Sequence, residues 1–115
     1  MRWILDDRGT VTAEFAVALP VVLLVLLLSV AALQGAALQV RVVDAAAVAA
    51  RTLARGDADA DADDRVTRLV GEHSLASGTD GDFVCATVTA PIRFGQFAAA
   101  GLEARARSCA LAGGQ

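Results

Sequence analysis

The stretch Arg8-Gly9-Thr10-Val11-Thr12-Ala13-Glu14-Phe15 leads directly into an apolar run that ends at Leu33. Counted from Phe15, this run has 19 residues and is interrupted only by Pro20 and Ser29. An α-helix rises about 1.5 Å per residue, so the run would span roughly 28 Å, which is close to the thickness of the hydrocarbon core of a bilayer. The sequence therefore predicts a transmembrane helix over residues 10–34, with the rest of the chain carried C-terminal to it.

Glu14 is the unusual residue of this segment, because it lies where the apolar run begins. A carboxylate next to hydrocarbon is costly, so it usually has a partner or a function. One interpretation is that Glu14 marks the membrane interface, where a helix N-terminus favours negative charge. The residues around it suggest a second interpretation, because a basic residue and a glycine, Arg8 and Gly9, precede it and a long apolar helix follows at once.

This arrangement resembles the processing site of type IV prepilins, specifically the TadE-like minor pseudopilins of tight-adherence (Tad, or Flp) pili, over about residues 8–35. The resemblance implies that a prepilin peptidase cuts between Gly9 and Thr10, which would place Glu14 fifth in the mature chain. Pro20 fits a proline that the family tolerates within the span. Phe15 departs from the major Flp pilins, which often have tyrosine there, and is compatible with the minor pseudopilins.

The resemblance also implies a role and a location. The protein would be a non-catalytic structural and assembly component of an adhesive pilus, with residues 1–9 as its leader. Its partners would be the prepilin peptidase, membrane lipid, other pilins and pseudopilins, and the inner-membrane assembly platform. It would cross the cell membrane once, with a cytoplasmic N-terminus and an external C-terminus, and Glu14 would be matched to the ammonium group of another subunit's first residue.

Two alternatives from other classes remain open. The chain could be an uncleaved single-span subunit of an envelope complex. It could also be a small secreted protein, released by signal peptidase after Ser29-Val30-Ala31. Signal peptides usually have apolar cores of 7–15 residues, whereas this run is longer and begins beside Glu14.

Composition and residue pattern argue against two further classes of protein, nucleic-acid-binding proteins and enzymes. The chain has 115 residues, a net charge of −3 and no basic cluster, which argues against nucleic-acid binding. The pattern offers no nucleophile–base pair, no paired carboxylates and no phosphate loop, so we predict neither an enzyme nor a cofactor or metal site.

Beyond the span, residues 35–56 are expected to continue the helix outside the membrane. Residues 36–55 contain neither proline nor glycine and are rich in alanine, the best helix former. One face is apolar and should be buried: Leu38, Val42, Ala45, Ala49 and Leu53. Gly56 supplies a C-terminal stop. The alternative is two helices hinged at Gly35.

Residues 57–115 are expected to form an acidic linker and a small α+β tail. The alternating aspartates of residues 57–64 begin like an EF-hand loop, but Ala62 stands where that loop needs glycine and Arg68 where it needs glutamate. We therefore interpret them as a solvated linker, followed by a short helix from Arg65 to His73. His73 should be a surface residue near the helix end, and residues 77–82 a turn-rich loop.

Two alternating runs, Phe83–Ala90 and Leu102–Ala110, predict an antiparallel hairpin. Pro91 should end the first strand, with a long connection over residues 92–101. One pairing register places the apolar faces of the two strands on the same side of the hairpin and their polar faces on the other. Its pairs are Cys85 with Cys109, Thr87 with Arg107, Val88 with Ala106, and Thr89 with Arg105. The apolar face of the hairpin could then lie on Leu38, Val42 and Ala45.

The two cysteines, Cys85 and Cys109, are expected to form a disulfide in an oxidising compartment. Such a bridge would add roughly 3 kcal/mol to a small core. Two buried thiols or a redox pair are the alternatives, although a CxxC spacing is absent. The predicted fold class is α+β: a long N-terminal helix with a transmembrane half and an exported amphipathic half, a short second helix, and a small C-terminal antiparallel β-hairpin.

Overall fold

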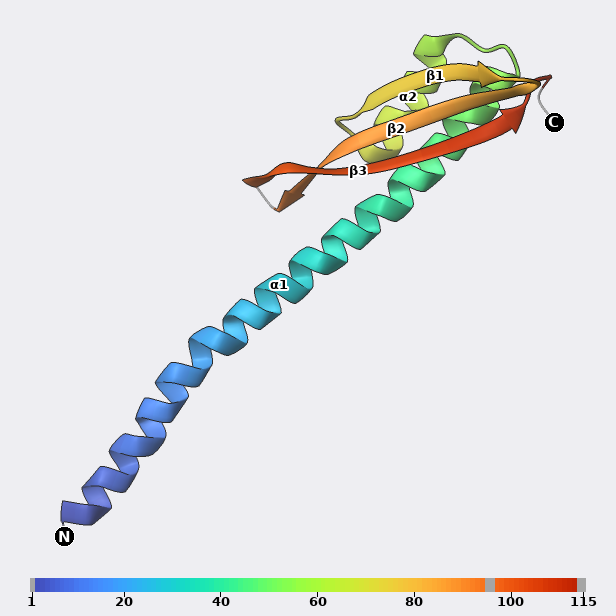
Figure 1. Cartoon of the computed structure of the whole chain (residues 1–115). Helices are drawn as coiled ribbons and strands as arrows, with labels where there is room; N and C mark the ends of the chain where they lie inside the picture. Colours follow the sequence, from blue (N-terminus) through green and yellow to red (C-terminus); the bar gives the residue numbers. More distant parts are fainter. Residues whose placement is uncertain (1, 95–96, 114–115) are drawn as a thin grey trace. The chain divides into compact units, whose positions relative to one another are not determined.

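The computed structural model describes residues 2–94 and 97–113, with side-chain burial for residues 9–93 and 101–113. The elements in chain order are α1 (Arg2–Ala54), α2 (Asp59–Val70), β1 (Ser74–Asp80), β2 (Phe83–Phe94) and β3 (Phe97–Leu111) (Figure 1). The chain divides into two compact units, Met1–Leu33 and Gln34–Gln115. A long helix, a short helix and an antiparallel sheet confirm the α+β class.

Within the second unit, α1 buries one face of its C-terminal part. The fully buried side chains of this part follow the expected three- and four-residue spacing: Val42, Ala45, Ala46, Ala49 and Ala50. Arg41, Asp44 and Arg51, on the other side, are exposed. The amphipathic helix that the sequence predicts is therefore confirmed, and α1 contains Gly35 without a break in the helix.

The end of α1 has the hydrogen bonds of a Schellman motif. The amide of Gly56 donates to the carbonyl of Leu53 (3.0 Å), and the amide of Asp57 donates to the carbonyl of Thr52 (3.3 Å). Gly56 has a φ of 87°, which a residue with a Cβ rarely adopts. The predicted stop at Gly56 is confirmed.

The helix α2 begins at Asp59, six residues earlier than Arg65, where the sequence analysis placed its start. The prediction that residues 57–64 form a linker was therefore wrong for most of that range. The reason is that Asp59 and Asp61 lie in the first turn, where carboxylates stabilise the positive end of a helix. Ala62 and Val66, one turn apart, are buried and pack α2 into the core.

Three strands form one sheet in the order β1-β2-β3 (Figure 1), so the predicted hairpin has an additional strand. The expectation of a loop over residues 77–82 was wrong for Ser77 to Asp80, which belong to β1, and right for the turn at Gly81 and Asp82. β1 is nearly all exposed and is attached by its backbone ladder to β2, from Ser74 opposite Thr89 to Asp80 opposite Phe83. Gly81, with a φ of 60°, begins the two-residue turn, as a type II′ hairpin requires.

The register of β2 and β3 is the one that the sequence predicts. Cys85 lies opposite Cys109, and the three further pairs also agree: Thr87 with Arg107, Val88 with Ala106, and Thr89 with Arg105. The prediction of a long connection over residues 92–101 was wrong, because the two strands continue until Phe94 pairs with Phe97. The side chains of Phe94 and Phe97 lie outside the described residues.

Pro91 does not end β2, contrary to the sequence-based prediction. It pairs with Glu103 of β3, and the register shifts between Pro91 and Arg93. β1 pairs only as far as Thr89, so β2 is an edge strand at Pro91 and needs no amide donor on that side. The bulge that follows accommodates the proline within the ladder.

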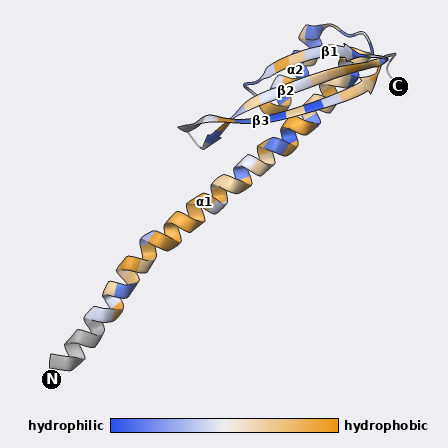
Figure 2. Cartoon of the chain, viewed as in Figure 1, coloured by the Kyte–Doolittle hydropathy of each residue, from blue (hydrophilic) through white to orange (hydrophobic). Residues whose placement is uncertain are grey.

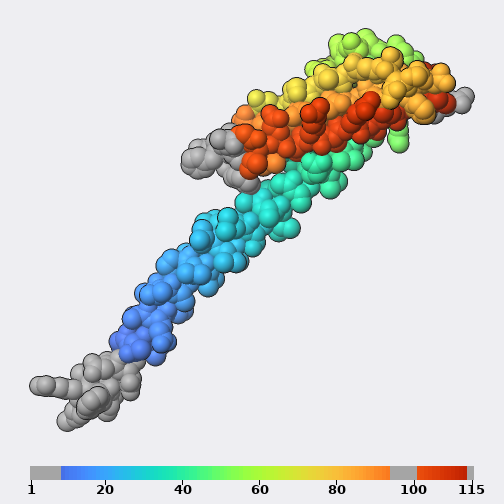
Figure 3. Space-filling view, viewed as in Figure 1, coloured from blue at the N-terminus to red at the C-terminus, as the bar shows by residue number. Residues whose placement is uncertain are grey.

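The core of the second unit lies between the sheet and the two helices. It is built mainly from alanine and valine: Val42, Ala45, Ala46, Ala49 and Ala50 of α1, Ala62 and Val66 of α2, and Ala86, Val88, Ala90 and Ala104 of the sheet. The strands lie side by side over the C-terminal part of α1 (Figure 3). Small side chains let the helices approach the sheet closely, and the expected packing of the hairpin on α1 is confirmed.

Candidate functional site

The residues of the predicted processing motif all lie on α1, in the first unit. Gly9, Thr10, Glu14 and Phe15 are exposed, and a Cβ added at Gly9 would meet no atom within 4 Å. The peptide bond between Gly9 and Thr10 is therefore helical and open to a partner. Glycine weakens a helix interior by about 1 kcal/mol relative to alanine, so Gly9 is the point of this turn that unwinds most easily.

Glu14 lies on a helix face whose other side chains, apart from Thr10, are alanine and valine. A shallow hollow of about 560 Å³ runs along this face, lined by Thr10, Ala13, Glu14, Val17, Ala18, Val21 and Val22. Small residues such as Ala13 and Ala18 allow a second helix backbone to come close. The face thus combines a surface on which a helix can pack with a single carboxylate that a cation can match.

The apolar segment of α1 is long and apolar enough to cross a membrane, with a mean hydropathy of 2.9 over its most apolar window. Figure 2 shows it as a band of hydrophobic colour. No described residue from Gly9 to Leu33 is buried, and Val17 and Leu27 are 72% and 69% exposed. Exposed apolar surface of this extent is typical of a helix that lies in lipid or among neighbouring helices.

The two interruptions of the apolar segment are compatible with such surroundings. Ser29 donates from its hydroxyl to the carbonyl of Val25 (2.8 Å), which satisfies the hydroxyl within the helix. Pro20 has no amide hydrogen, so it cannot donate to the carbonyl of Ala16. Prolines of this kind are tolerated in spanning helices, because neighbouring groups satisfy the carbonyl.

Cys85 and Cys109 form the predicted disulfide between β2 and β3. Cys85 is 5% exposed, whereas Cys109 is exposed. The bridge connects two strands that already pair, and it closes a loop with a sequence separation of 24. This arrangement staples the sheet and does not form a CxxC redox site.

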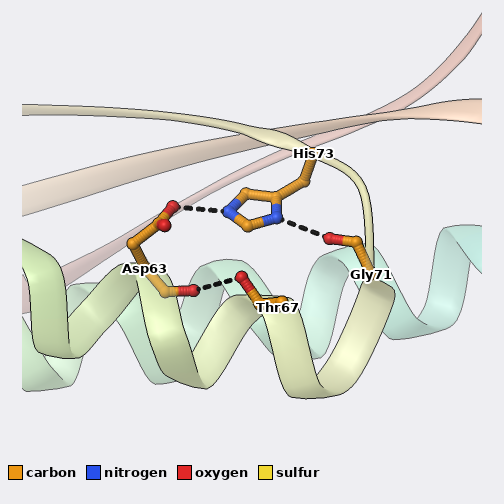
Figure 4. A network of polar contacts seen from close by, with 4 residues as sticks. All are labelled: Asp63, Thr67, Gly71 and His73. Atoms are coloured by element: carbon orange, nitrogen blue, oxygen red, sulfur yellow. Dashed lines mark hydrogen bonds and ion pairs between the residues drawn. The ribbon is translucent and has the colours of Figure 1, made fainter.

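His73 was expected at the surface, and that expectation was wrong. Its side chain is only 5% exposed, and both ring nitrogens have partners (Figure 4). Nε2 lies 2.7 Å from Oδ1 of Asp63 on α2, and Nδ1 lies 2.7 Å from the carbonyl oxygen of Gly71. No sequence pattern pointed to this pair, because Asp63 and His73 stand ten positions apart and only the turn after α2 brings them together.

A groove of about 470 Å³ lies in the second unit. It is lined by Gln34, Ala37, Leu38, Arg41, Val70, Glu72, Pro91, Ile92 and Arg93. Arg93 and Glu72 form an ion pair on its rim. Among the described residues, no group of three or more His, Cys, Asp or Glu side chains could hold a metal ion, in this groove or elsewhere.

Comparison with known proteins gives one informative similarity. The chain is 42% identical over 79 residues to the protein named "Apoptosis inhibitor Rv3655c" of Mycobacterium tuberculosis (strain ATCC 25618 / H37Rv). The match covers 67% of this chain and 62% of the relative, so the chain spans about three-fifths of the relative's length. No family model matches the chain, and no solved structure matches it.

Proposed function

We propose that the protein is a TadE-like minor pseudopilin, a non-catalytic component of the assembly of a tight-adherence type IV pilus. The observation that carries the proposal is the segment Arg8–Phe15 at the head of an apolar helix, with Gly9 and Glu14 five residues apart. Membrane insertion, with the N-terminus in the cytoplasm and the second unit outside, belongs to the same proposal.

Three structural features support it. The Gly9–Thr10 bond is exposed, so a membrane peptidase could reach it. Glu14 lies among small apolar side chains on one helix face, where the ammonium group of a neighbouring subunit's first residue could pair with it. The second unit, a small disulfide-stapled domain, suits an exported tail.

The test is the N-terminus of the protein in the membrane fraction, determined by intact mass and terminal sequencing. The proposal predicts a start at Thr10. A start at Met1 would contradict it and favour the uncleaved single-span subunit. A start at Ala32, with the protein in the soluble fraction, would favour the secreted alternative, in which signal peptidase acts after Ala31.

The similarity to the mycobacterial protein favours a second candidate function, inhibition of apoptosis. The 42% identity is the observation that supports it, and it rests on the relative's name. The test applies the purified full chain to cultured animal cells driven into apoptosis and measures the apoptotic fraction. If cells driven into apoptosis show the same apoptotic fraction with and without the protein, this candidate is contradicted. The pseudopilin proposal is unaffected by that result.

A further inference from the structure

The groove of about 470 Å³ in the second unit has no part in the proposed function. One of its walls is a single face of α1, because the four residues follow a spacing of three and four: Gln34, Ala37, Leu38 and Arg41. The remaining lining comes from the end of α2, the connection after it and β2: Val70, Glu72, Pro91, Ile92 and Arg93. Segments distant in the chain therefore build this groove together.

The lining of the groove is amphiphilic. Leu38, Val70 and Ile92 are half-buried and form its apolar part. Arg41 is exposed, and among the residues that the structure describes its side chain forms no ion pair or hydrogen bond. The other arginine of the lining, Arg93, is paired with Glu72. Arg41 is therefore the cation of this lining that can receive an anionic ligand.

The α1 wall of the groove begins where the apolar segment ends. Gln34 directly follows Leu33 in the chain, and α1 continues through both residues. With Leu33 at the edge of the hydrocarbon, the headgroup layer covers about the next 5–8 Å, which corresponds to Gln34 to Leu38. Arg41 follows Gln34 by about 10 Å along the helix, but helical side chains lean towards the N-terminus, so its guanidinium extends back into the headgroup layer.

We propose that this groove binds the headgroup of an anionic phospholipid, with the guanidinium of Arg41 on the phosphate and the apolar lining against the glycerol end of the acyl chains. The inference rests on the membrane insertion that belongs to the proposed function, and not on cleavage or pilus assembly. A guanidinium presents paired N–H donors to phosphate oxygens, and such charge-assisted hydrogen bonds are strong. The exposed amide of Gln34 supplies a further donor on the same helix face.

Charge and polarity favour an anionic lipid over a zwitterionic lipid or a free phosphate ion. Two arginines and one glutamate give the lining a net charge of +1, which complements a headgroup with a single negative charge. A choline headgroup would bring a further cation beside these arginines. A free phosphate ion would leave Leu38, Val70 and Ile92 in contact with water, whereas the glycerol and first acyl carbons of a lipid would cover them.

The first measurement uses the full chain in neutral maltoside micelles, into which a short-chain phosphatidylglycerol is titrated. The amide NMR signals of Leu38, Val70 and Ile92 should shift and reach saturation. Short-chain phosphatidylcholine should bind about fivefold more weakly, which is the effect of one charge near a membrane surface. Equal binding of the two lipids, or the same shifts with inorganic phosphate, would overturn the proposal. Shifts that follow the protein concentration without lipid would assign the groove to a second copy and overturn it as well.

Two pairs of variants test the site itself. Arg41→Gln should weaken phosphatidylglycerol binding by at least about tenfold, because it removes a charged hydrogen-bond donor. Arg51→Gln removes the same charge from an exposed position of α1 outside the groove and should leave binding nearly unchanged. Ala37→Phe narrows the groove and should weaken binding, whereas Ala36→Phe, exposed and outside the lining, should not. Equal effects within either pair would overturn the proposal.

Flotation with phosphatidylcholine vesicles separates this inference from the proposed function, because it measures membrane insertion of the full chain alone. A chain that floats but binds phosphatidylglycerol without dependence on Arg41 would overturn the lipid site and leave the pseudopilin proposal standing. A chain that does not float would overturn both.

Discussion

Cys85 and Cys109 occupy opposite positions of β2 and β3, with their Cα atoms 4.0 Å apart and their sulfur atoms bonded. The bond joins the central strand, β2, to β3, which is one of the two edge strands. Because alanine and valine make up most of the core, burial stabilises this sheet less than larger side chains would. The covalent bridge is therefore a large part of what stabilises the second unit.

Removal of the bridge should be costly. The double variant Cys85→Ser, Cys109→Ser should lose about 3 kcal/mol in the free energy of unfolding, because the unfolded chain gains the freedom of an open loop. Urea denaturation of the full chain in micelles, followed by amide NMR signals of β2, measures the change. Reductant should destabilise the wild type and leave the double variant unchanged; a wild type indifferent to reductant would contradict the prediction.

The close approach of α1 to the sheet should not tolerate a larger side chain. Ala49 is fully buried, so Ala49→Leu should destabilise the second unit by about 1–3 kcal/mol through overpacking. Ala36→Leu, at an exposed position of the same helix, is the matched control and should have little effect. The same urea measurement applies, and equal effects of the two variants would count against this packing.

The turn between β1 and β2 depends on the positive φ of Gly81. Gly81→Ala should cost about 1 kcal/mol, because a Cβ is strained at a φ of 60°. Gly78→Ala, within β1, is the control, since Gly78 has no positive φ and no atom would lie within 4 Å of its new Cβ. If Gly81→Ala were as stable as Gly78→Ala, the turn would not have the proposed geometry.

The processing motif can be tested at Gly9. Gly9→Val should leave the chain uncleaved, since a β-branched side chain would stand at the scissile bond. Gly35→Val places the same side chain in another open position of α1 and should be processed normally. Intact mass of the membrane-fraction protein distinguishes the two products, and cleavage of Gly9→Val at the wild-type rate would contradict the assigned bond.

The charge of Glu14 should matter for assembly and not for insertion. Glu14→Gln keeps the shape of the side chain but cannot pair as a carboxylate with an ammonium group, so pili should be reduced by at least about tenfold at unchanged membrane levels. Glu103→Gln, an exposed glutamate of β3, is the control. Electron microscopy and immunoblotting measure pili and protein, and normal piliation of Glu14→Gln would count against the proposed role.

Elements with a strong hydrophobic periodicity could be predicted from the amino-acid sequence. The apolar segment of α1, its amphipathic continuation with Val42 and Ala49 inward, and the register of Cys85 with Cys109 all follow from spacing. In each case one face of an element differs clearly from the other, and a slip of one residue would exchange the faces. The processing motif proposed at Gly9 and Glu14 likewise rests on the chain alone, through its resemblance to a family.

Elements that have no such pattern depend on how the chain packs, and the sequence did not predict them. β1 is exposed and has the composition of a turn, so its strand exists because β2 offers it a backbone ladder. Pro91 stays within β2 because β1 has already ended beside it. His73 is covered because the turn after α2 brings it to Asp63. These are contacts between different elements of the fold. The local propensity of each segment carries no information about them.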